Sequence, residues 1–213
     1  MARDVAPNRK RARSRAAAGG EKPNLPKGMR ARAQIISAAE ALFNRQGVDR
    51  ASMRDIASAA RTQPAAVYYY FASKEELLWA VWEKGGLELR KRVSEAIAPE
   101  TDPWRRLEAA CVAHVTGLLD WRRAVQVLFV LPPWLYPESI KSRVVELRDG
   151  YEQMFVDLIA DLPLARDTDR RYVRLSLIGA LSWSLFWFKK GGDTPAAISK
   201  KMLSMLRAGI DPR

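Results

Sequence analysis

The stretch from residue 35 to residue 78 decides the fold: IISAAEALFNRQGVDRASMRDIASAARTQPAAVYYYFASKEELL. Its first apolar residues recur at the three- and four-residue spacing of a helix that buries one side, and Gly47 follows where such a helix is expected to stop. Ser52, with Asp55 three residues later, is the pattern of a capping box and predicts the start of a short second helix.

A third short helix is predicted from Pro64 to Phe71, because proline suits the first turn of a helix. Ser73 and Glu76 predict another capping box, at the start of a longer fourth helix. The second and third helices, with a tight turn near Arg61 between them, have the lengths of a helix-turn-helix, in which the second helix lies in the major groove of DNA.

The rest of the chain continues the helical pattern. Prolines and capping residues divide it into five further predicted helices, at about 102–120, 122–131, 138–161, 169–190 and 195–208. No segment shows the alternation of a strand. We therefore predict an all-α protein of about nine helices, with an N-terminal three-helix helix-turn-helix DNA-binding domain and a larger C-terminal helical ligand-binding and dimerisation domain.

Charge is concentrated at the N-terminus. The chain has a formal net charge of +12, and residues 1–34 hold ten Lys or Arg against Asp4 and Glu21. Such a basic balance indicates a polyanionic partner, either nucleic acid or an anionic membrane surface. We predict a flexible basic arm over 1–28, a DNA-binding domain over 29–80, and a ligand-binding and dimerisation domain over 81–213. The arm either reaches DNA beside the main contact or merely solubilises the protein.

The segment 35–78 resembles the DNA-binding domain of the TetR family of transcriptional regulators. The matching residues are Ala39, Leu42, Phe43, Gly47, Ile56, Ala57, Ala60, Tyr68, Phe71, Ser73, Lys74, Glu76 and Leu77. The resemblance implies a homodimer whose larger domain binds a small apolar or amphipathic ligand between helices and pairs through its last two helices.

One position departs from the family pattern. Arg61 stands where the family usually has a glycine that adopts a positive φ. If the same backbone is kept, an arginine there costs on the order of 1 kcal/mol.

The leading end of the third helix carries the residues that we expect to read DNA. Gln63 can pair with adenine, and small side chains beside it can touch thymine methyl groups, while tyrosines and cations hold phosphates. The predicted DNA-binding residues are Arg54, Thr62, Gln63, Ala65, Ala66, Tyr68, Tyr69 and Lys74. The alternative for the tyrosines is an aromatic plug in the small domain, but three in a row cannot all face inward on a helix.

The larger domain holds most of the aromatic residues. We predict ligand-pocket residues Trp104, His114, Trp121, Phe129, Trp134, Phe155 and Trp183. We predict dimer-interface residues Leu177, Leu181, Leu185, Ile198, Met202 and Met205. The alternative for both sets is ordinary core packing, which also applies to His114 and to Cys111, although Cys111 could instead sense thiol oxidation.

Gly85 and Gly86 lie within the predicted fourth helix, which joins the DNA reader to the sensor. Each glycine weakens a helix interior by about 1 kcal/mol. We predict a compliant point there, at which ligand binding alters the distance between the two reading heads.

These observations predict a sequence-specific repressor that a small ligand releases from a palindromic operator. The chain's ending faintly resembles regulators that sense acyl-CoA thioesters, so the ligand is expected to be an acyl-CoA or a lipid-like molecule. With one His, one Cys and no metal-ligand spacing, we expect no catalysis, no cofactor and no metal. We expect a cytoplasmic, nucleoid-associated protein without a membrane span. The alternatives are an activator or a ligand-independent DNA-binding protein of the same fold, and, more remotely, an RNA-binding or membrane-surface protein.

Overall fold

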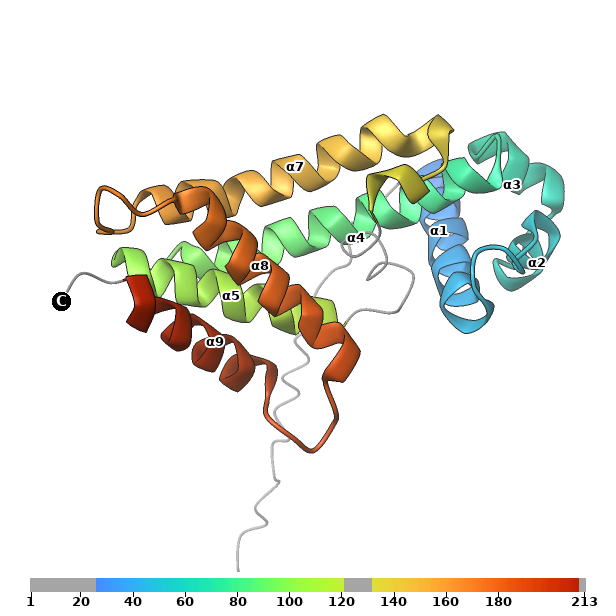
Figure 1. Ribbon diagram of the computed structural model, residues 1–213. Coiled ribbons are helices and arrows are strands. Elements are labelled where there is room, and N and C mark those ends of the chain that lie inside the picture. Colours follow the sequence, from blue (N-terminus) through green and yellow to red (C-terminus); the bar gives the residue numbers. More distant parts are fainter. Residues whose placement is uncertain (1–25, 121–131, 211–213) are drawn as a thin grey trace, which may run out of the picture.

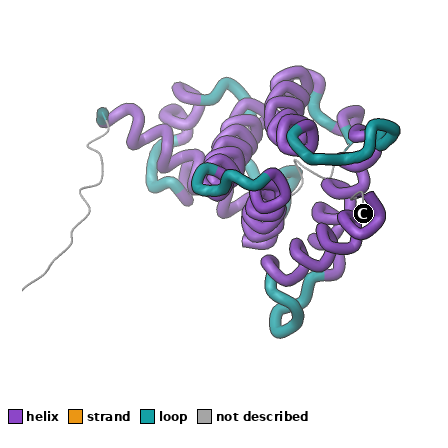
Figure 2. The backbone as a smooth tube through the Cα atoms, turned by 90° about the vertical axis from the view of Figure 1, so that its left-hand side faces the viewer, coloured by secondary structure: helices purple, strands orange, loops and turns teal. Residues whose placement is uncertain are grey.

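A computed structural model of the chain describes residues 26–120 and 132–210. All regular structure in these residues is helical, as Figure 2 shows, which confirms the predicted all-α fold. The elements are α1 (Lys27–Gln46), α2 (Met53–Ala59), α3 (Pro64–Tyr70), α4 (Lys74–Ile97), α5 (Pro103–Asp120), the short 3-10 helix η1 (Pro133–Leu135), α7 (Glu138–Ala160), α8 (Arg170–Trp187) and α9 (Pro195–Ile210).

Local capping explains where many of these helices begin. Ser52 and Asp55 form the predicted capping box, in which each side chain accepts a hydrogen bond from the other residue's backbone N–H. The Ser73 hydroxyl accepts a hydrogen bond from the Glu76 N–H, but the Glu76 carboxylate bonds to Arg143 of α7. The second predicted capping box therefore forms only in its serine half.

The molecule has a head at one end and a body at the other (Figure 1). We call residues 26–82 the head, which comprises α1, α2, α3 and the start of α4, and the described residues from 83 onward the body. Helices α4 and α7 run side by side between the two ends, and α5, α8 and α9 pack at the far end.

Residues from α7 complete the core of the head. Ile56, Val67 and Leu77 are buried there, and the same hydrophobic cluster includes Ile140 and Val144, each fully buried. The predicted boundary at residue 80 falls inside α4, so the head and the body share this continuous helix as well as the start of α7.

The body has its own hydrophobic cluster around α5. Leu107, Phe155 and Leu181, which lie on α5, α7 and α8, are fully buried in it. Gly117 of α5 permits a close crossing with α4, because a Cβ at this position would lie 2.4 Å from a methyl carbon of Leu89.

At Gly85 and Gly86, where the sequence predicts a compliant point, the structure shows close packing instead. Helix α4 is unbroken through both glycines, and both are buried. A Cβ on Gly86 would lie only 2.8 Å from Leu147 of α7, so the missing side chain lets the two helices approach closely. The physical role of Gly86 is close packing between helices, which opposes bending rather than permitting it.

Two predicted features fall partly or wholly outside the described residues. Most of the basic arm does so, although α1 already begins at Lys27, inside the range 1–28 predicted for the arm. The predicted helix over 122–131 also lies outside. None of the described helices is long and apolar enough to cross a membrane.

Candidate nucleic-acid interface

The turn between α2 and α3 is built on a left-handed residue. Arg61 has φ 53°, the only positive φ of a non-glycine residue in the part of the chain that the structure describes. The Arg61 N–H donates to the Ser58 carbonyl and the Thr62 N–H donates to the Ala57 carbonyl, which is the Schellman pattern of helix termination. The expected backbone is therefore kept, with arginine in the place that favours glycine.

Helix α1 braces this turn from behind. The Gln34 side-chain amide donates a hydrogen bond of 2.8 Å to the carbonyl of Ala60, the last residue before Arg61. The buried face of α1, which includes Ala39 and Phe43, packs in the same core as Ile56. A local hydrogen-bond pattern and a tertiary brace together fix the angle between α2 and α3.

The leading end of α3 is open to solvent. Gln63 is the N-cap residue of α3, is exposed, and makes no side-chain capping bond, so its amide group is available for a partner. Ala65 is exposed, whereas Thr62 and Ala66 are half-buried. The structure thus brings all four residues to one helix start, with Gln63 and Ala65 open to solvent.

The three consecutive tyrosines divide between the two roles that the sequence left open. Tyr68 and Tyr69 are 54% and 82% exposed, and Tyr70 is half-buried against α1, with its ring edge-on to that of Tyr69 at 4.9 Å. Phe71, which follows, is buried beneath the guanidinium of Arg32. Tyr68 and Tyr69 therefore hold large aromatic rings in water, whereas Tyr70 and Phe71 pack against the core of the head.

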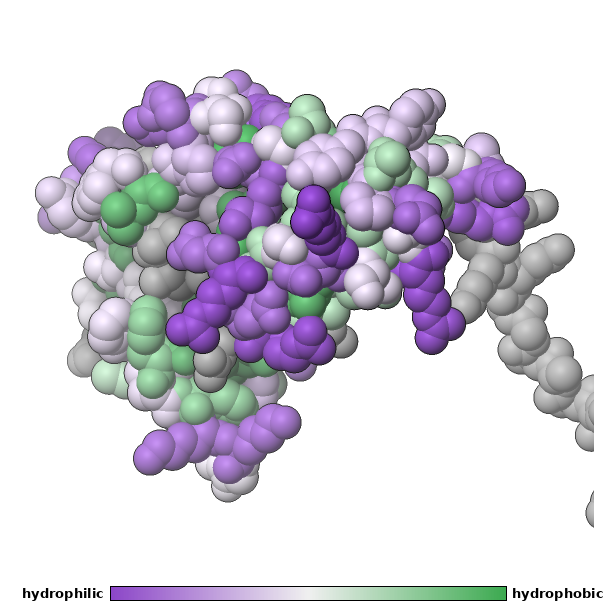
Figure 3. All heavy atoms as spheres, turned by 90° about the vertical axis from the view of Figure 1, so that its right-hand side faces the viewer, coloured by the Kyte–Doolittle hydropathy of each residue, from purple (hydrophilic) through white to green (hydrophobic). Residues whose placement is uncertain are grey.

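The cations of the predicted set flank this helix. Arg54 is exposed at the start of α2, and Lys74 at the start of α4 donates to the Asp49 carbonyl at 3.2 Å. Tyr68 and Lys74 line the same surface groove, of about 450 Å³. Figure 3, which looks onto the head end of the molecule, shows strongly hydrophilic side chains spread across this face. The surface suits a polyanion whose phosphates are contacted on both sides of α3.

The predicted ligand-pocket residues lie in different places in the described parts of the chain. His114 and Phe155 meet in the core of the body, with ring centroids 5.7 Å apart. Trp134 and Trp183 are instead 76% and 61% exposed, and this placement contradicts their prediction as enclosed pocket residues. For Trp183 the pattern misled because the second half of α8 is apolar on nearly every side, whereas Trp134 lies on η1. Trp121 and Phe129 lie outside the described residues.

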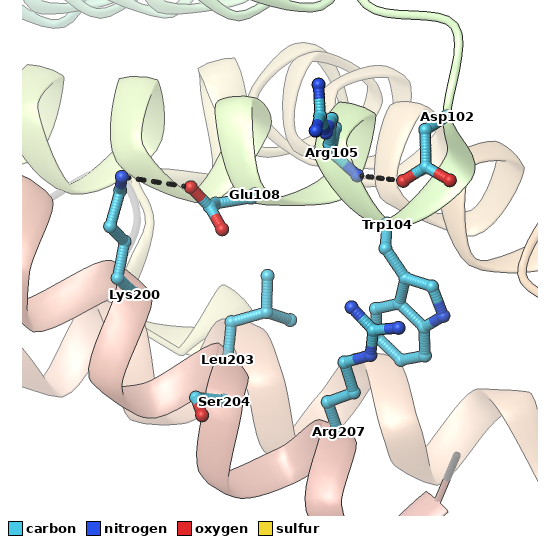
Figure 4. Close-up of a pocket in the computed structure, with 8 residues that line it drawn as sticks. All are labelled: Asp102, Trp104, Arg105, Glu108, Lys200, Leu203, Ser204 and Arg207. Carbon is cyan, nitrogen blue, oxygen red and sulfur yellow. Dashed lines mark hydrogen bonds and ion pairs between the residues drawn. The ribbon is translucent and has the colours of Figure 1, made fainter. Parts of the chain in front are cut away.

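Trp104, the remaining member of that set, belongs to another site. It lies about 15 Å from His114 along α5 and faces a groove of about 450 Å³ between α5 and α9 (Figure 4). Arg207 stacks over its indole ring at 4.5 Å, and Lys200 pairs with Glu108 at 3.2 Å across the same groove. These contacts join α9 to α5.

His114 is at the centre of a buried polar chain in the body. Its Nδ1 lies 2.7 Å from the hydroxyl of Tyr151 on α7, and its Nε2 lies 3.4 Å from the hydroxyl of Ser182 on α8. Burial lowers the pKa of His114 to about 4 and raises the pKa of Tyr151, so the imidazole is neutral and the phenol keeps its proton at pH 7. The chain links three helices through uncharged groups.

Cys111 lies one helical turn before His114 and is fully buried. Burial raises the pKa of its thiol, which suppresses the thiolate needed for redox chemistry. The structure therefore favours the core alternative for Cys111 over thiol sensing.

The predicted dimer residues divide in a similar way. Leu177, Leu181 and Ile198 are buried within the chain itself, so they belong to the core alternative, and their prediction as interface residues is corrected. Leu185 and Met202 are half-buried, and Met205 is 78% exposed. The exposed apolar side of α8 consists of Tyr172, Leu175, Trp183, Phe186 and Trp187.

Comparisons with known proteins match both ends of the chain. Residues 35–81 match the profile described as "Bacterial regulatory proteins, tetR family", and residues 100–210, more than half of the chain, match "Tetracyclin repressor-like, C-terminal domain". The transcriptional repressor KstR2 of Mycobacterium tuberculosis is 25% identical over 195 residues, which cover 84% of this chain and 92% of KstR2.

Two further relatives show the range of the similarity. The transcriptional activator FasR of Mycolicibacterium smegmatis is 35% identical over 105 residues, covering 49% of this chain and 48% of FasR. The crystal structure of AibR, in complex with isovaleryl coenzyme A and operator DNA, superposes with a TM-score of 0.70 at 23% identity and covers 82% of this chain and 97% of AibR.

Proposed function

Because the chain belongs to the TetR family of DNA-binding transcriptional regulators, and is therefore not an enzyme, we propose that it is a repressor that a small ligand releases from a palindromic operator. The observation that carries the proposal is the exposed start of α3, where Gln63 has no partner within the capping pattern and Tyr69 is 82% exposed. A short recognition helix reads few base pairs, so a two-fold symmetric dimer is needed to read a longer site.

Several features of the head support the assignment of DNA contacts. The exposed side chains of Gln63 and Ala65 suit contacts to base edges, and those of Arg54, Tyr69 and Lys74 suit contacts to phosphates. The basic arm precedes α1 and would add contacts to the backbone that depend on salt.

The exposed aromatic side of α8 supports a homodimer. Trp183 and Phe186 contact each other with ring centroids 4.4 Å apart, yet both are about 60% exposed. Apolar rings gathered on one helix face are typical of a surface that a second protein covers. Met205 of α9 is exposed as well. A second copy of the chain, related by two-fold symmetry, would cover this face.

For the ligand, we propose an acyl-CoA or a similar lipid-like molecule. The chain of buried Tyr151 and His114 with half-buried Ser182 supplies uncharged hydrogen-bonding groups inside an apolar body. Such groups suit a carbonyl or hydroxyl on a mostly apolar ligand. Isovaleryl coenzyme A, which the AibR structure holds in a similar fold, offers a thioester carbonyl and an apolar acyl chain of this kind beside a charged coenzyme A moiety.

The test begins with the DNA that the native protein selects from a random pool. A palindromic duplex should emerge, and binding to it should exceed binding to structured RNA or to anionic vesicles at the same salt concentration. Acyl-CoA esters of rising chain length are then titrated against the complex, with free coenzyme A as the control. Release by the esters but not by coenzyme A supports the proposal, and selection of no duplex sequence contradicts it.

An activator is the second candidate function, favoured by the similarity to FasR across 49% of the chain. The two differ in the sign of regulation, which a reporter gene reveals. With the selected site overlapping the promoter, a repressor lowers transcription until ligand is added. An activator instead raises transcription from a site placed upstream of the promoter.

A further inference from the structure

Helix α7 contacts the head at the same level at which α4 leaves it. The guanidinium of Arg143 on α7 donates two hydrogen bonds to the Glu76 carboxylate, from Nη1 at 3.1 Å and from Nη2 at 2.5 Å. The same guanidinium lies over the ring of Trp79, 5.1 Å from its centroid. Two charge-assisted bonds and a stacking contact therefore fix one arginine in a single orientation against the first turns of α4.

Two more contacts continue the junction along α4. The ring of Tyr136, just before α7, meets that of Trp82 edge-on at 5.7 Å, and the Tyr136 hydroxyl accepts a hydrogen bond from Arg148. One turn further, Leu147 fills the space that Gly86 leaves open. The three contacts lie along one side of α4. Tilting of the head about α4 alone would have to break the first two, which join the head to Arg143 and Tyr136, while the third packs α4 against α7 just beyond the head.

From this geometry we infer that Arg143 is a positioning residue for DNA recognition: with Glu76 and Trp79 it clamps the head to α7 and so sets the distance between the two reading heads of a dimer. The inference rests on the proposed function, because only a dimer has two heads to space. In place of the compliant point predicted at Gly85 and Gly86, the inference puts a junction between α4 and α7 that is stiff because α7 packs against α4.

The spacing of an operator's half-sites is the property that such a clamp controls. Adding one base pair between half-sites moves the second half-site by about 3.4 Å and turns it by about 35°. A head held at a fixed angle cannot follow that change, whereas a loosened head can follow part of it. Base contacts at the start of α3 do not depend on Arg143, so reading within a half-site should be independent of the clamp.

The experiment uses the full-length protein and the palindromic DNA that it selects from a random pool. Affinity is measured for that operator and for versions with one base pair added to or removed from the centre, with native protein and with Arg143→Met. Methionine keeps bulk near Trp79 but removes the positive charge and the two N–H groups that bond to Glu76. The penalty for altered spacing should be roughly three- to fivefold smaller for the variant, the size expected of one partly exposed ion pair with a stacked guanidinium.

The matched control is Arg106→Met. Arg106 pairs with Asp161 at 2.8 Å entirely within the body, so the same chemical change should leave the spacing penalty at its native value. Arg143→Lys keeps the charge without the two-pronged geometry and should restore part of the strictness. Glu76→Gln removes the same ion pair from the other side, so it should reduce the spacing penalty as Arg143→Met does. It therefore tests the clamp even if Arg143→Met folds poorly.

The outcomes separate the clamp from the proposed function. If the native protein shows a large penalty for altered half-site spacing, and Arg143→Met and Glu76→Gln show an equal penalty, the clamp is overturned but the proposed function is not. An equal loosening by Arg106→Met would do the same, since it would reflect general destabilisation. A native protein that selects no two-part site would overturn the proposed function, and the clamp with it.

Discussion

Two patches of exposed aromatic residues, one on the head and one on the body, differ in what surrounds them. Tyr68 and Tyr69 lie beside an unpartnered amide and beside cations of α2 and α4. Trp183 and Phe186 lie on an apolar side of α8. Exposed rings alone do not identify a partner. The polar neighbours of the tyrosines suit DNA, and the apolar neighbours of the α8 rings suit a second protein surface.

The most direct test of this comparison is a double substitution on α8. Replacing both Trp183 and Phe186 by Glu places charges in the proposed dimer interface, where they would lose hydration without gaining partners. Analytical ultracentrifugation should then show a monomer, and affinity for the palindromic operator should fall by about 100-fold or more, because bivalent binding is lost. Trp134→Glu is the control, since Trp134 is even more exposed but lies outside α8. A double variant that remains dimeric would assign this patch another role.

On the head, the corresponding change is Gln63→Ala. Loss of a bidentate contact to a base should cost about 1–3 kcal/mol in operator binding and relax the preference at a single position of each half-site. Sequencing of the DNA that the variant selects measures both effects. Ser58→Ala, at an exposed position of α2 beside the turn, should leave the selected sequence unchanged. A uniform loss across all sequences would instead assign Gln63 to phosphate contact.

A third test concerns the buried polar chain of the body. His114 has its pKa lowered to about 4 in the folded protein, whereas the unfolded chain titrates near 6.5. Between these values the unfolded state binds more protons, so stability should fall as the pH is lowered from about 6.5 towards 4, by about 2 kcal/mol at pH 5. Chemical denaturation at pH 7 and pH 5, with native protein and with His114→Gln, isolates this contribution. Equal losses in the two proteins would show that His114 is not responsible.

The smallest expected effect belongs to the turn of the head. Arg61→Gly relieves a left-handed arginine and should raise the free energy of unfolding by up to about 1 kcal/mol, partly offset by the greater freedom of glycine in the unfolded chain. Thermal denaturation measures the gain. If operator affinity falls while stability rises, then Arg61 itself contacts phosphate, and a change in neither quantity would mean that the turn carries no strain.

Features that depend on neighbouring residues were predictable from the sequence. The capping box at Ser52 and the left-handed turn at Arg61 are set by hydrogen bonds within a few residues. The exposed start of α3 follows from Pro64 and from the helix-turn-helix pattern. This is why the turn and the exposed start of α3 could be predicted from the sequence, while the DNA contacts of the residues there stay a prediction.

Features that depend on packing between distant helices were not predictable. The second half of helix α8 is apolar on nearly every side, so its periodicity could not show that Leu181 faces the core while Trp183 faces solvent. Gly86 resembled a hinge because nothing in its neighbourhood reveals Leu147 of α7. The pair of Glu76 and Arg143 joins residues 67 positions apart.

The shared core of the head has a consequence for protein engineering. Tyr136, Ile140 and Val144 complete a cluster that otherwise consists of residues up to Trp82. A fragment ending after α4 would leave that cluster uncovered on one side, so the reading module is discontinuous in the chain. A chimera that grafts this specificity onto another sensor should therefore transplant the segment 136–147 together with the first 82 residues, or redesign the receiving helix to match.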